Sequence, residues 1–155
     1  MSRQLFRTRQ NALIYLLLPL TIGLSGFILL RKRKSLPSLF NYWDKSKYKA
    51  LKKFIIAQSK VETGGYSSGL FLRANNAFGM KNALYRDQYG YKVQGDPYRN
   101  YANVLDSIKD FELYLDSVGF PVTVNSAEAY TGNLKRLNYF ESPLNDYTKA
   151  LKSWL

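Results

Sequence analysis

The feature that most constrains this chain is an uncharged apolar run near its start. Residues 12–30 (ALIYLLLPLTIGLSGFILL) are nineteen consecutive residues without a charged side chain. At a rise of about 1.5 Å per residue, a helix of this length spans roughly the hydrocarbon core of a bilayer. We therefore expect one transmembrane helix over residues 12–30, within a basic-flanked anchor segment 1–34, and a lipid bilayer as its partner.

A cleaved signal peptide is the alternative interpretation of this run, because three arginines precede it. The run is long, however, and it ends in Arg31-Lys32-Arg33-Lys34 without a small-x-small cleavage site, which favours an uncleaved anchor. Basic residues stand on both sides of the run, so the positive-inside rule is nearly balanced and leans toward a cytoplasmic C-terminus. The orientation therefore stays open.

The remainder of the chain is long enough to bury one core. We expect a linker over residues 35–41, where Pro37 disfavours helix continuation, and a single domain over residues 42–155. Of the formal net charge of +12, seven positive charges lie in residues 1–34, which leaves +5 for the rest. Much of the basicity therefore flanks the apolar run. No helix-turn-helix, zinc-knuckle or aromatic RNP pattern is present, and we expect no nucleic-acid partner.

Histidine and cysteine are both absent from the sequence. Their absence excludes Ser-His-Asp and Cys-His nucleophilic catalysis, His-ligated zinc, thiolate metal sites and disulfide bonds. Carboxylates, hydroxyls, lysine and tyrosine are the chemical groups that remain. We expect no cofactor and no metal.

One acidic residue, Glu62, stands at the end of an apolar helical pattern that covers about residues 42–60. A turn rich in Gly, Ser and Asn follows directly. A half-buried carboxyl at a helix end is costly to ionise, so its pKa rises toward the range where it can donate a proton at neutral pH. An ordinary surface carboxylate near a helix C-terminus is the competing interpretation.

This segment resembles the signature of the bacterial autolysin and flagellar-type peptidoglycan glucosaminidases. The matching residues are Ala57, Glu62, Gly64, Ser67 and Gly69, followed by Ala74-Asn75-Asn76-Ala77-Phe78-Gly79-Met80-Lys81. In that family a helix ends in a catalytic Glu, and a Gly-rich turn and an Asn-Asn-x-Phe-Gly-x-Lys segment follow. The resemblance extends over roughly residues 49–155. It implies a lysozyme-like, mainly α (α+β) fold with a small β lobe and a cleft.

Residues 83–101 (ALYRDQYGYKVQGDPYRNY) have no helical period and predict a short hairpin or an extended lobe. Their last four residues, Tyr98-Arg99-Asn100-Tyr101, resemble a Phe-Arg-x-Tyr element of the family, which often carries a Glu on the strand upstream. The resemblance therefore implies Asp87 as the second carboxylate, with Asp in place of Glu. Asp96 precedes Pro97 and is more typical of a turn.

Three more helices are predicted in the last third of the chain. The first follows Asn103 and ends at Gly119, the second covers about residues 126–137, and the third has Ser142 as its N-cap and Pro143 at its first position.

Two tyrosines accompany the last two of these helices. Tyr139 and Tyr147 match the family's Gly-Tyr-Ala-Thr tyrosine and a second Tyr some eight residues later. The resemblance implies that Tyr139 lies near the catalytic Glu and orients the substrate or the reacting water.

These features predict a membrane-anchored peptidoglycan hydrolase that cleaves the β-1,4 bond after N-acetylglucosamine. Glu62 would protonate the leaving oxygen, Asp87 would activate water or stabilise the oxocarbenium-like state, and Tyr139 would position the reactants. The expected substrate-binding residues are Asn75, Asn76, Phe78, Tyr98 and Tyr147. The catalytic domain would lie in the periplasm or otherwise outside the cytoplasmic membrane, or in the internal membrane of a phage virion that penetrates the wall locally.

Three other functions remain open at this point. A lytic transglycosylase shares the architecture and needs one acid/base Glu without a second carboxylate. A non-catalytic wall-binding or structural membrane protein would keep the fold without the activity. A membrane-disrupting protein would act through its basic anchor on liposomes that lack any wall.

Overall fold

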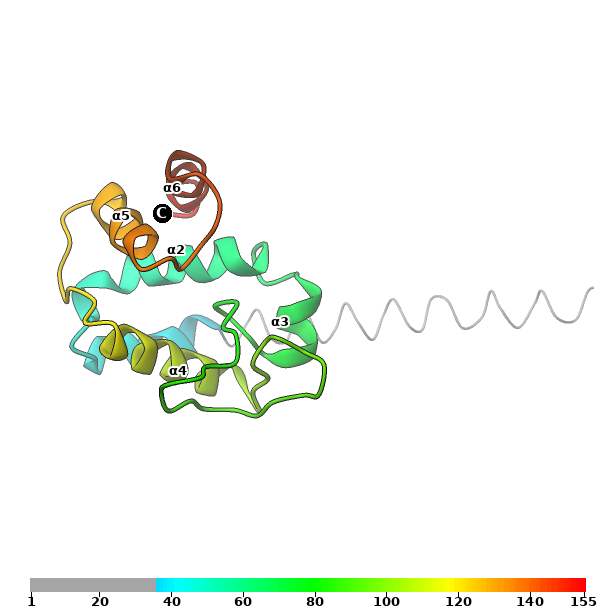
Figure 1. Cartoon of the computed structure of the whole chain (residues 1–155). Helices are drawn as coiled ribbons and strands as arrows, with labels where there is room; N and C mark the ends of the chain where they lie inside the picture. The colour runs from blue at the N-terminus through cyan, green and yellow to red at the C-terminus, as the bar shows by residue number, and fades with distance from the viewer. Residues whose placement is uncertain (1–35) are drawn as a thin grey trace, which may run out of the picture. The chain divides into compact units, whose positions relative to one another are not determined.

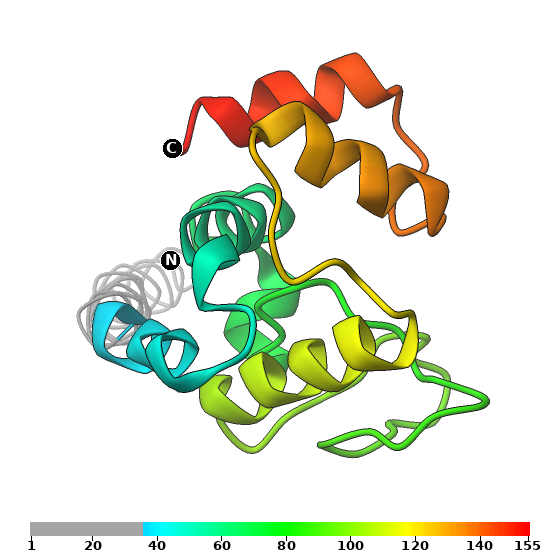
Figure 2. The same ribbon diagram turned by 90° about the vertical axis from the view of Figure 1, so that its left-hand side faces the viewer.

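The computed structural model describes residues 36–155 (Figures 1 and 2). The predicted transmembrane helix over residues 12–30 lies outside these residues. Residues 37–155 form one compact unit, which is described by itself here. In residues 36–155, no helix combines the length and the apolar character needed to cross a bilayer.

The described residues are mainly helical, which confirms the predicted fold class at that level and is consistent with a lysozyme-like fold. Strand content is small, with two isolated antiparallel bridges in residues 36–155, Lys81 to Tyr98 and Tyr91 to Asn100. The named elements are the 3-10 helices η1 (Asn41–Lys45) and η2 (Lys49–Leu51), and the α-helices α2 (Lys52–Thr63), α3 (Gly69–Ala74), α4 (Val104–Ser117), α5 (Ala127–Arg136) and α6 (Leu144–Lys152).

The predicted linker over residues 35–41 is instead helical over residues 36–40. The reason is burial of a large apolar side chain. Phe40 is 2% exposed, and its ring lies 6.2 Å from the ring of Tyr66 and 6.5 Å from that of Phe78. This packing favours the helical turn, because full burial of a Phe side chain contributes about 1.5–3 kcal/mol.

The single helix expected over residues 42–60 is interrupted before α2. Ser46 is extended, with φ −83° and ψ 154°, and its Oγ accepts a hydrogen bond from the backbone N–H of Tyr48 at 3.0 Å. A serine side chain that bonds nearby backbone competes with helix formation in this way. The chain therefore forms η1, a turn and η2 before α2 begins at Lys52.

Helix α2 lies between the α5–α6 pair and α4 (Figures 1 and 2). Its buried side chains include Phe54 and Ile55, and the ring of Phe54 stacks on that of Tyr130 from α5 at 5.4 Å. On the α4 side, Phe78 stacks on Phe111 with ring centroids 4.1 Å apart. Aromatic packing thus joins α2 to α5, and the segment after α3 to α4.

Of the two forms predicted for residues 83–101, a short hairpin or an extended lobe, the structure has the extended lobe. Side chains occupy backbone groups that a hairpin ladder would use. Gln88 accepts from the N–H of Ala83 and donates to the carbonyl of Lys81, both at 2.8 Å, and Arg99 donates to the carbonyls of Tyr89 and Gly90 at 2.7 and 2.8 Å. The lobe is therefore held by side-chain hydrogen bonds and the two bridges.

The two helices predicted next are confirmed with small shifts at their ends. Asn103 and Ser126 cap α4 and α5, accepting from the N–H groups of Asp106 and Ala129 at 3.0 and 3.1 Å. The chain after α4 turns at Gly119, which has φ +62°.

The start of the last helix differs from the prediction by one residue. Helix α6 begins at Leu144, and its N-cap is Pro143 in place of Ser142. Pro143 has ψ 139°, which is extended backbone, so the helix cannot include it.

Candidate active site

A cleft of about 630 Å³ brings together the end of α2, the segment after α3, the lobe and the turn between α5 and α6. Its walls combine polar, aromatic and charged side chains from segments that are distant in sequence. It is lined by Glu62, Leu70, Phe78, Gly79, Met80, Lys81, Asn82, Ala83, Arg86, Tyr98, Tyr114, Leu137, Asn138, Tyr139, Phe140 and Glu141.

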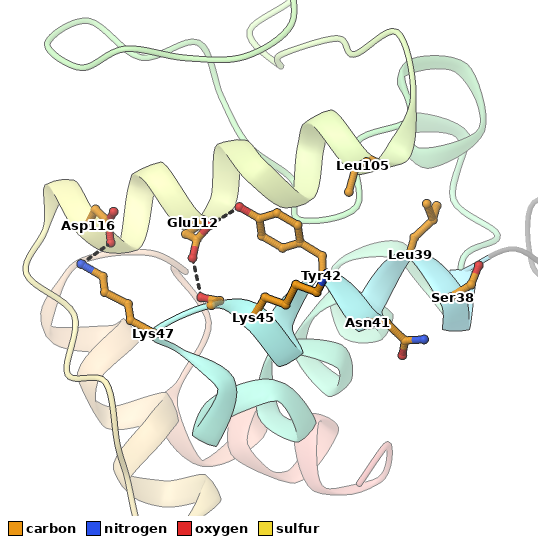
Figure 3. A pocket seen from close by; sticks show the side chains of 10 residues that line it. Ser38, Leu39, Asn41, Tyr42, Lys45, Lys47, Leu105, Glu112 and Asp116 are labelled. Atoms are coloured by element: carbon orange, nitrogen blue, oxygen red, sulfur yellow. Dashed lines mark hydrogen bonds and ion pairs between the residues drawn. The ribbon is translucent and has the colours of Figure 1, made fainter.

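A second cavity, of about 770 Å³, lies between η1 and α4 (Figure 3). Its two acids already have partners. Glu112 accepts from the hydroxyls of Tyr42 and Ser46, and Asp116 pairs with Lys47 at 2.8 Å. We place the candidate active site in the smaller cleft, because its acid Glu62 has a raised pKa and faces segments with the predicted motif.

Glu62 stands in the last turn of α2, where two glycines end the helix. Gly64 and Gly65 both have positive φ, +55° and +66°, a left-handed conformation that glycine adopts without steric cost. The Glu62 side chain is partly buried, and its Oε1 accepts a hydrogen bond from the hydroxyl of Tyr147 at 2.5 Å. The local sequence thus delivers a carboxyl at the end of a rigid helix.

Burial raises the pKa of Glu62 above its ordinary value, and the hydrogen bond from Tyr147 opposes this by stabilising the charged form. The direction agrees with the one expected from the sequence. A carboxyl with a raised pKa keeps its proton to higher pH, so it can act as a general acid in the cleft.

Gly79 lies directly against this carboxyl. A Cβ at this position would come within 3.1 Å of Glu62 Oε2, and the residue has φ +63°. The segment is fixed from the other side by Tyr139, whose hydroxyl donates to the carbonyl of Phe78. Burial raises the pKa of Tyr139 well above its ordinary value, so its phenol stays protonated. The structure therefore brings Tyr139 next to the Glu62 segment, at the wall of the cleft.

Asn75 and Asn76 hold the turn that leads into the cleft and do not line it. Asn76 is 1% exposed, and its Nδ2 donates to the carbonyls of Met80 and Arg99, both at 2.9 Å. Asn75 ends α3 with φ +52° and donates to the carbonyl of Tyr101 at 3.0 Å. Their amides are thus used by the protein backbone.

The other expected binding residues lie at the cleft in different ways. Tyr98 and Phe78 both line the cleft. Phe78 is 1% exposed and packs on Phe111, so it supports the cleft wall and presents little surface to a substrate. Tyr147 is buried and contacts the cleft through Glu62.

Asp87 is exposed, and it is not among the residues that line the cleft. Its neighbour Arg86 lines the cleft instead, and the guanidinium of Arg86 is held by Asp110 through bonds of 2.9 and 3.2 Å. Asp96 pairs with Arg73 at 2.9 Å and accepts from the N–H of Tyr98 at 3.0 Å, the turn role expected for it.

Several residues at the cleft were not singled out from the sequence, notably Arg86, Tyr114, Phe140 and Glu141. Glu141 is the second carboxylate among the cleft-lining residues, and it comes from the turn between α5 and α6. Its position two residues after Tyr139 is the one sequence signal that points to it. In residues 36–155, no group of three or more His, Cys, Asp or Glu is arranged to hold a metal ion.

A partly buried acid at the edge of an open cleft in a mainly helical domain is an arrangement that suits a glycoside hydrolase. Residues 43–154 match the glucosaminidase family model, described as mannosyl-glycoprotein endo-beta-N-acetylglucosaminidase. The chain belongs to this family and is a glycoside hydrolase that acts on peptidoglycan. No curated protein and no solved structure matches the chain.

Proposed function

We propose that this chain cleaves the glycan strand of peptidoglycan at the β-1,4 bond after N-acetylglucosamine, with Glu62 as the general acid. One observation carries the assignment of the acid. Glu62 lines the cleft from the end of α2 with a raised pKa, while Tyr147 holds its Oε1 at 2.5 Å. The family match supports the substrate class.

In the proposed reaction, protonated Glu62 gives its proton to the glycosidic oxygen as the bond to the sugar C1 carbon breaks. The carboxylate that forms is stabilised by the hydrogen bond from Tyr147. Water then adds to C1, and a second group accepts the proton of that water. Tyr139 positions the reactants by fixing the Phe78 carbonyl and the segment that faces Glu62.

The second group has two candidates. The family resemblance implies Asp87, whereas the geometry favours Glu141, because Glu141 lines the cleft and Asp87 does not. Inverting glycosidases separate their two carboxyls by about 6.5–9.5 Å to leave room for the attacking water. Glu141 is exposed to solvent at the edge of the same cleft, which suits a residue that meets water.

A lytic transglycosylase is the second candidate function, and the exposed position of Asp87 outside the cleft favours it. Such an enzyme uses one acid/base Glu and releases anhydro-muramyl ends in place of new reducing ends. Mass spectrometry of the products separates the two reactions, because the anhydro product is lighter by one water.

We further propose that residues 12–30 anchor the enzyme in a membrane and that the domain acts on the wall side of it. A phage virion with an internal membrane is one setting for such local wall penetration. Both proposals rest on the uncharged apolar run and its basic flanks.

The test of the Glu62 assignment is a zymogram and turbidity assay on purified peptidoglycan with the full chain. Glu62→Gln is expected to lose activity by about 10²–10⁴-fold, the usual contribution of a general acid. Glu128→Gln, an exposed acid of α5 that pairs with Lys152, is the matched control and should clear peptidoglycan like the wild type. Equal clearing by wild type and Glu62→Gln would overturn the assignment.

The two candidates for the second group are compared with Asp87→Asn and Glu141→Gln in the same assay. We expect Glu141→Gln to lower kcat by at least about tenfold, as removal of a general base does, and Asp87→Asn to keep the wild-type rate. The reverse result would assign the role to Asp87. Two fully active variants that release anhydro-muramyl ends would favour the transglycosylase.

A further inference from the structure

A lysine that does not line the cleft holds the turn that does. Lys135 stands in the last turn of α5, and its Nζ lies 3.3, 3.0 and 2.9 Å from the carbonyl oxygens of Phe140, Glu141 and Ser142. An ammonium group has three N–H donors and no acceptor, so three converging carbonyls use its full set. Three successive carbonyl groups of the turn between α5 and α6 are therefore bound by the one ammonium group of Lys135.

The same turn is fixed to α6 by an aromatic stack. The rings of Phe140 and Tyr147 are nearly parallel, at 2°, with centroids 3.8 Å apart, and Lys135 Nζ lies 5.2 Å from the centroid of Phe140. Such pairs contribute about 0.5–1.5 kcal/mol beyond their burial. Because the ring faces are in contact, the stack restricts how Tyr147 can rotate.

Tyr147 in turn donates to Glu62 Oε1 at 2.5 Å. Direct contacts thus run without a break from Lys135 through Phe140 and Tyr147 to the proposed acid. Helix α6 has no side-chain hydrogen bond at its N-terminal cap, so the chain just before it depends on other contacts. The bond from Lys135 to the Ser142 carbonyl is such a contact.

We propose that Lys135 and Phe140 are positioning residues: they hold the Tyr147 hydroxyl against Glu62 and keep Glu141 at the edge of the cleft. The proposal deepens the proposed function and rests on it for the role of Glu62. It predicts that a substitution at either residue changes the proton affinity of Glu62. The Lys135 substitution does so without removing a side chain that lines the cleft.

The groups that face Glu62 allow the direction of this change to be stated. Tyr130 from α5, Tyr139 from the turn and Tyr147 from α6 interact with it, and burial raises the pKa of each of these phenols, so all three are neutral at neutral pH. The charged side chains at the same cleft are Lys81, Arg86 and Glu141. Burial raises and the Tyr147 bond lowers the pKa of Glu62, so loss of that bond raises the pKa further.

The test measures the Glu62 carboxyl directly by ¹³C NMR titration of the full chain in detergent micelles, without substrate. Lys135→Met keeps the aliphatic stem and removes the three donors, and Phe140→Leu keeps an apolar side chain and removes the stack. Both are expected to raise the pKa of Glu62, in the same direction as Tyr147→Phe. Lys149→Met, an exposed lysine of α6 outside the cleft, is the control and should leave the titration unchanged.

Kinetics on soluble glycan fragments supply the second measurement. Misplacement of the acid is expected to lower kcat by about tenfold or more with little change in KM, and to move the alkaline limb of the pH profile to higher pH. If Lys135→Met does not fold, the titration and the kinetics of Phe140→Leu still test the proposal. Folded variants with the wild-type Glu62 titration would overturn the proposal.

The titration is independent of activity, so the two proposals fail separately. A fully active Glu62→Gln variant would overturn the proposed function and leave a titration shift standing. Wild-type activity that depends on Glu62, together with an unmoved titration in both variants, would overturn the positioning role alone.

Discussion

Glu62 is held by two influences of opposite sign. Burial at the end of α2 favours its neutral form, and the Tyr147 hydroxyl favours its ionised form. A general acid needs both, because it must be protonated before the bond breaks and must tolerate the negative charge afterwards. Burial comes from the position of the end of α2. The hydroxyl comes from α6, which begins about eighty residues later in the chain.

The raised pKa of Glu62 has a consequence for stability. Its pKa is higher in the folded chain than in the unfolded chain, so the folded state binds this proton more tightly. The associated stability is fully present below the unfolded pKa and is lost as pH rises through the folded pKa. We therefore expect Glu62→Gln, which cannot ionise, to be more stable than wild type above the folded pKa and closer to it at low pH.

Thermal unfolding of the wild type and of Glu62→Gln across pH 4 to 8 checks this expected pH dependence. The range is set by the usual carboxyl pKa of about 4.3 and its upward shift. A melting-temperature difference that does not grow with pH would contradict it. Glu128→Gln, at an exposed position of α5, is the control. The hydrogen bond from Lys152 lowers the pKa of Glu128, so this variant should not gain stability over the wild type as pH rises.

Gly79 provides a second test at the scale of one residue. Gly79→Ala would place a methyl 3.1 Å from Glu62 Oε2 at a left-handed φ of +63°. We expect it to lower kcat/KM by about tenfold or more, because a displaced acid meets the glycosidic oxygen less often. Gly119→Ala has nearly the same φ, +62°, and nothing within 4 Å of the added Cβ.

The Gly119→Ala control should lose a similar amount of stability through backbone strain, of order 1 kcal/mol, and keep the activity. Denaturant unfolding and steady-state kinetics of the two variants separate strain from contact with Glu62. Equal loss of activity in both would show that only backbone strain matters.

At the scale of elements, the lobe depends on one buried carboxylate of α4. Asp110 is 0% exposed and accepts from the Arg86 guanidinium and from the Tyr101 hydroxyl at 2.7 Å. It also accepts from Gln88 and from the N–H of Tyr89, each at 3.2 Å. With two bridges in place of a sheet, these bonds hold the lobe against α4, alongside the bond from Asn76 to the Arg99 carbonyl and the Arg73–Asp96 pair.

Asp110→Asn should therefore release the lobe. Removing one charge of a buried pair leaves Arg86 uncompensated, and such changes cost about 3–5 kcal/mol. We expect rapid amide hydrogen exchange over residues 83–101 and loss of activity, since Arg86 and Tyr98 line the cleft from this lobe. Asp44→Asn breaks the more exposed pair with Lys52 and should cost about 0–1 kcal/mol. Unchanged exchange in Asp110→Asn would contradict the role of this carboxylate.

At the scale of the whole molecule, residues 37–155 form a compact unit with its own aromatic core, including Trp43, Phe78 and Phe111. We expect a chain that starts at residue 36 to unfold cooperatively and to keep hydrolytic activity. Only the full chain should float with membrane vesicles, because the apolar run over residues 12–30 is then present. Circular dichroism, a zymogram and vesicle flotation measure these outcomes. Flotation of the shortened chain would contradict the anchoring proposal.

Local chemistry explains the parts of the site that were predicted from the sequence. Gly64 and Gly65 end α2 directly after Glu62, Asn103 begins α4, and the absence of His and Cys restricts the available acids and bases. Each of these follows from backbone preference or side-chain inventory within a few residues. The helix end and the mainly helical class were accessible for that reason, whereas the family resemblance was what singled out Glu62 as the proposed acid.

Contacts between distant segments decided the rest. Gln88, Arg99 and Asp110 hold the lobe without a hairpin, so Asp87 lies exposed while Arg86 and Glu141 reach the cleft. Phe40 makes a helix of the expected linker by packing on Tyr66 and Phe78. The sequence by itself determined the helix end that carries Glu62, the residue that we propose as the acid. The tertiary structure alone decided which groups surround it, because burial, stacking and hydrogen bonds depend on residues that meet only when the chain is folded.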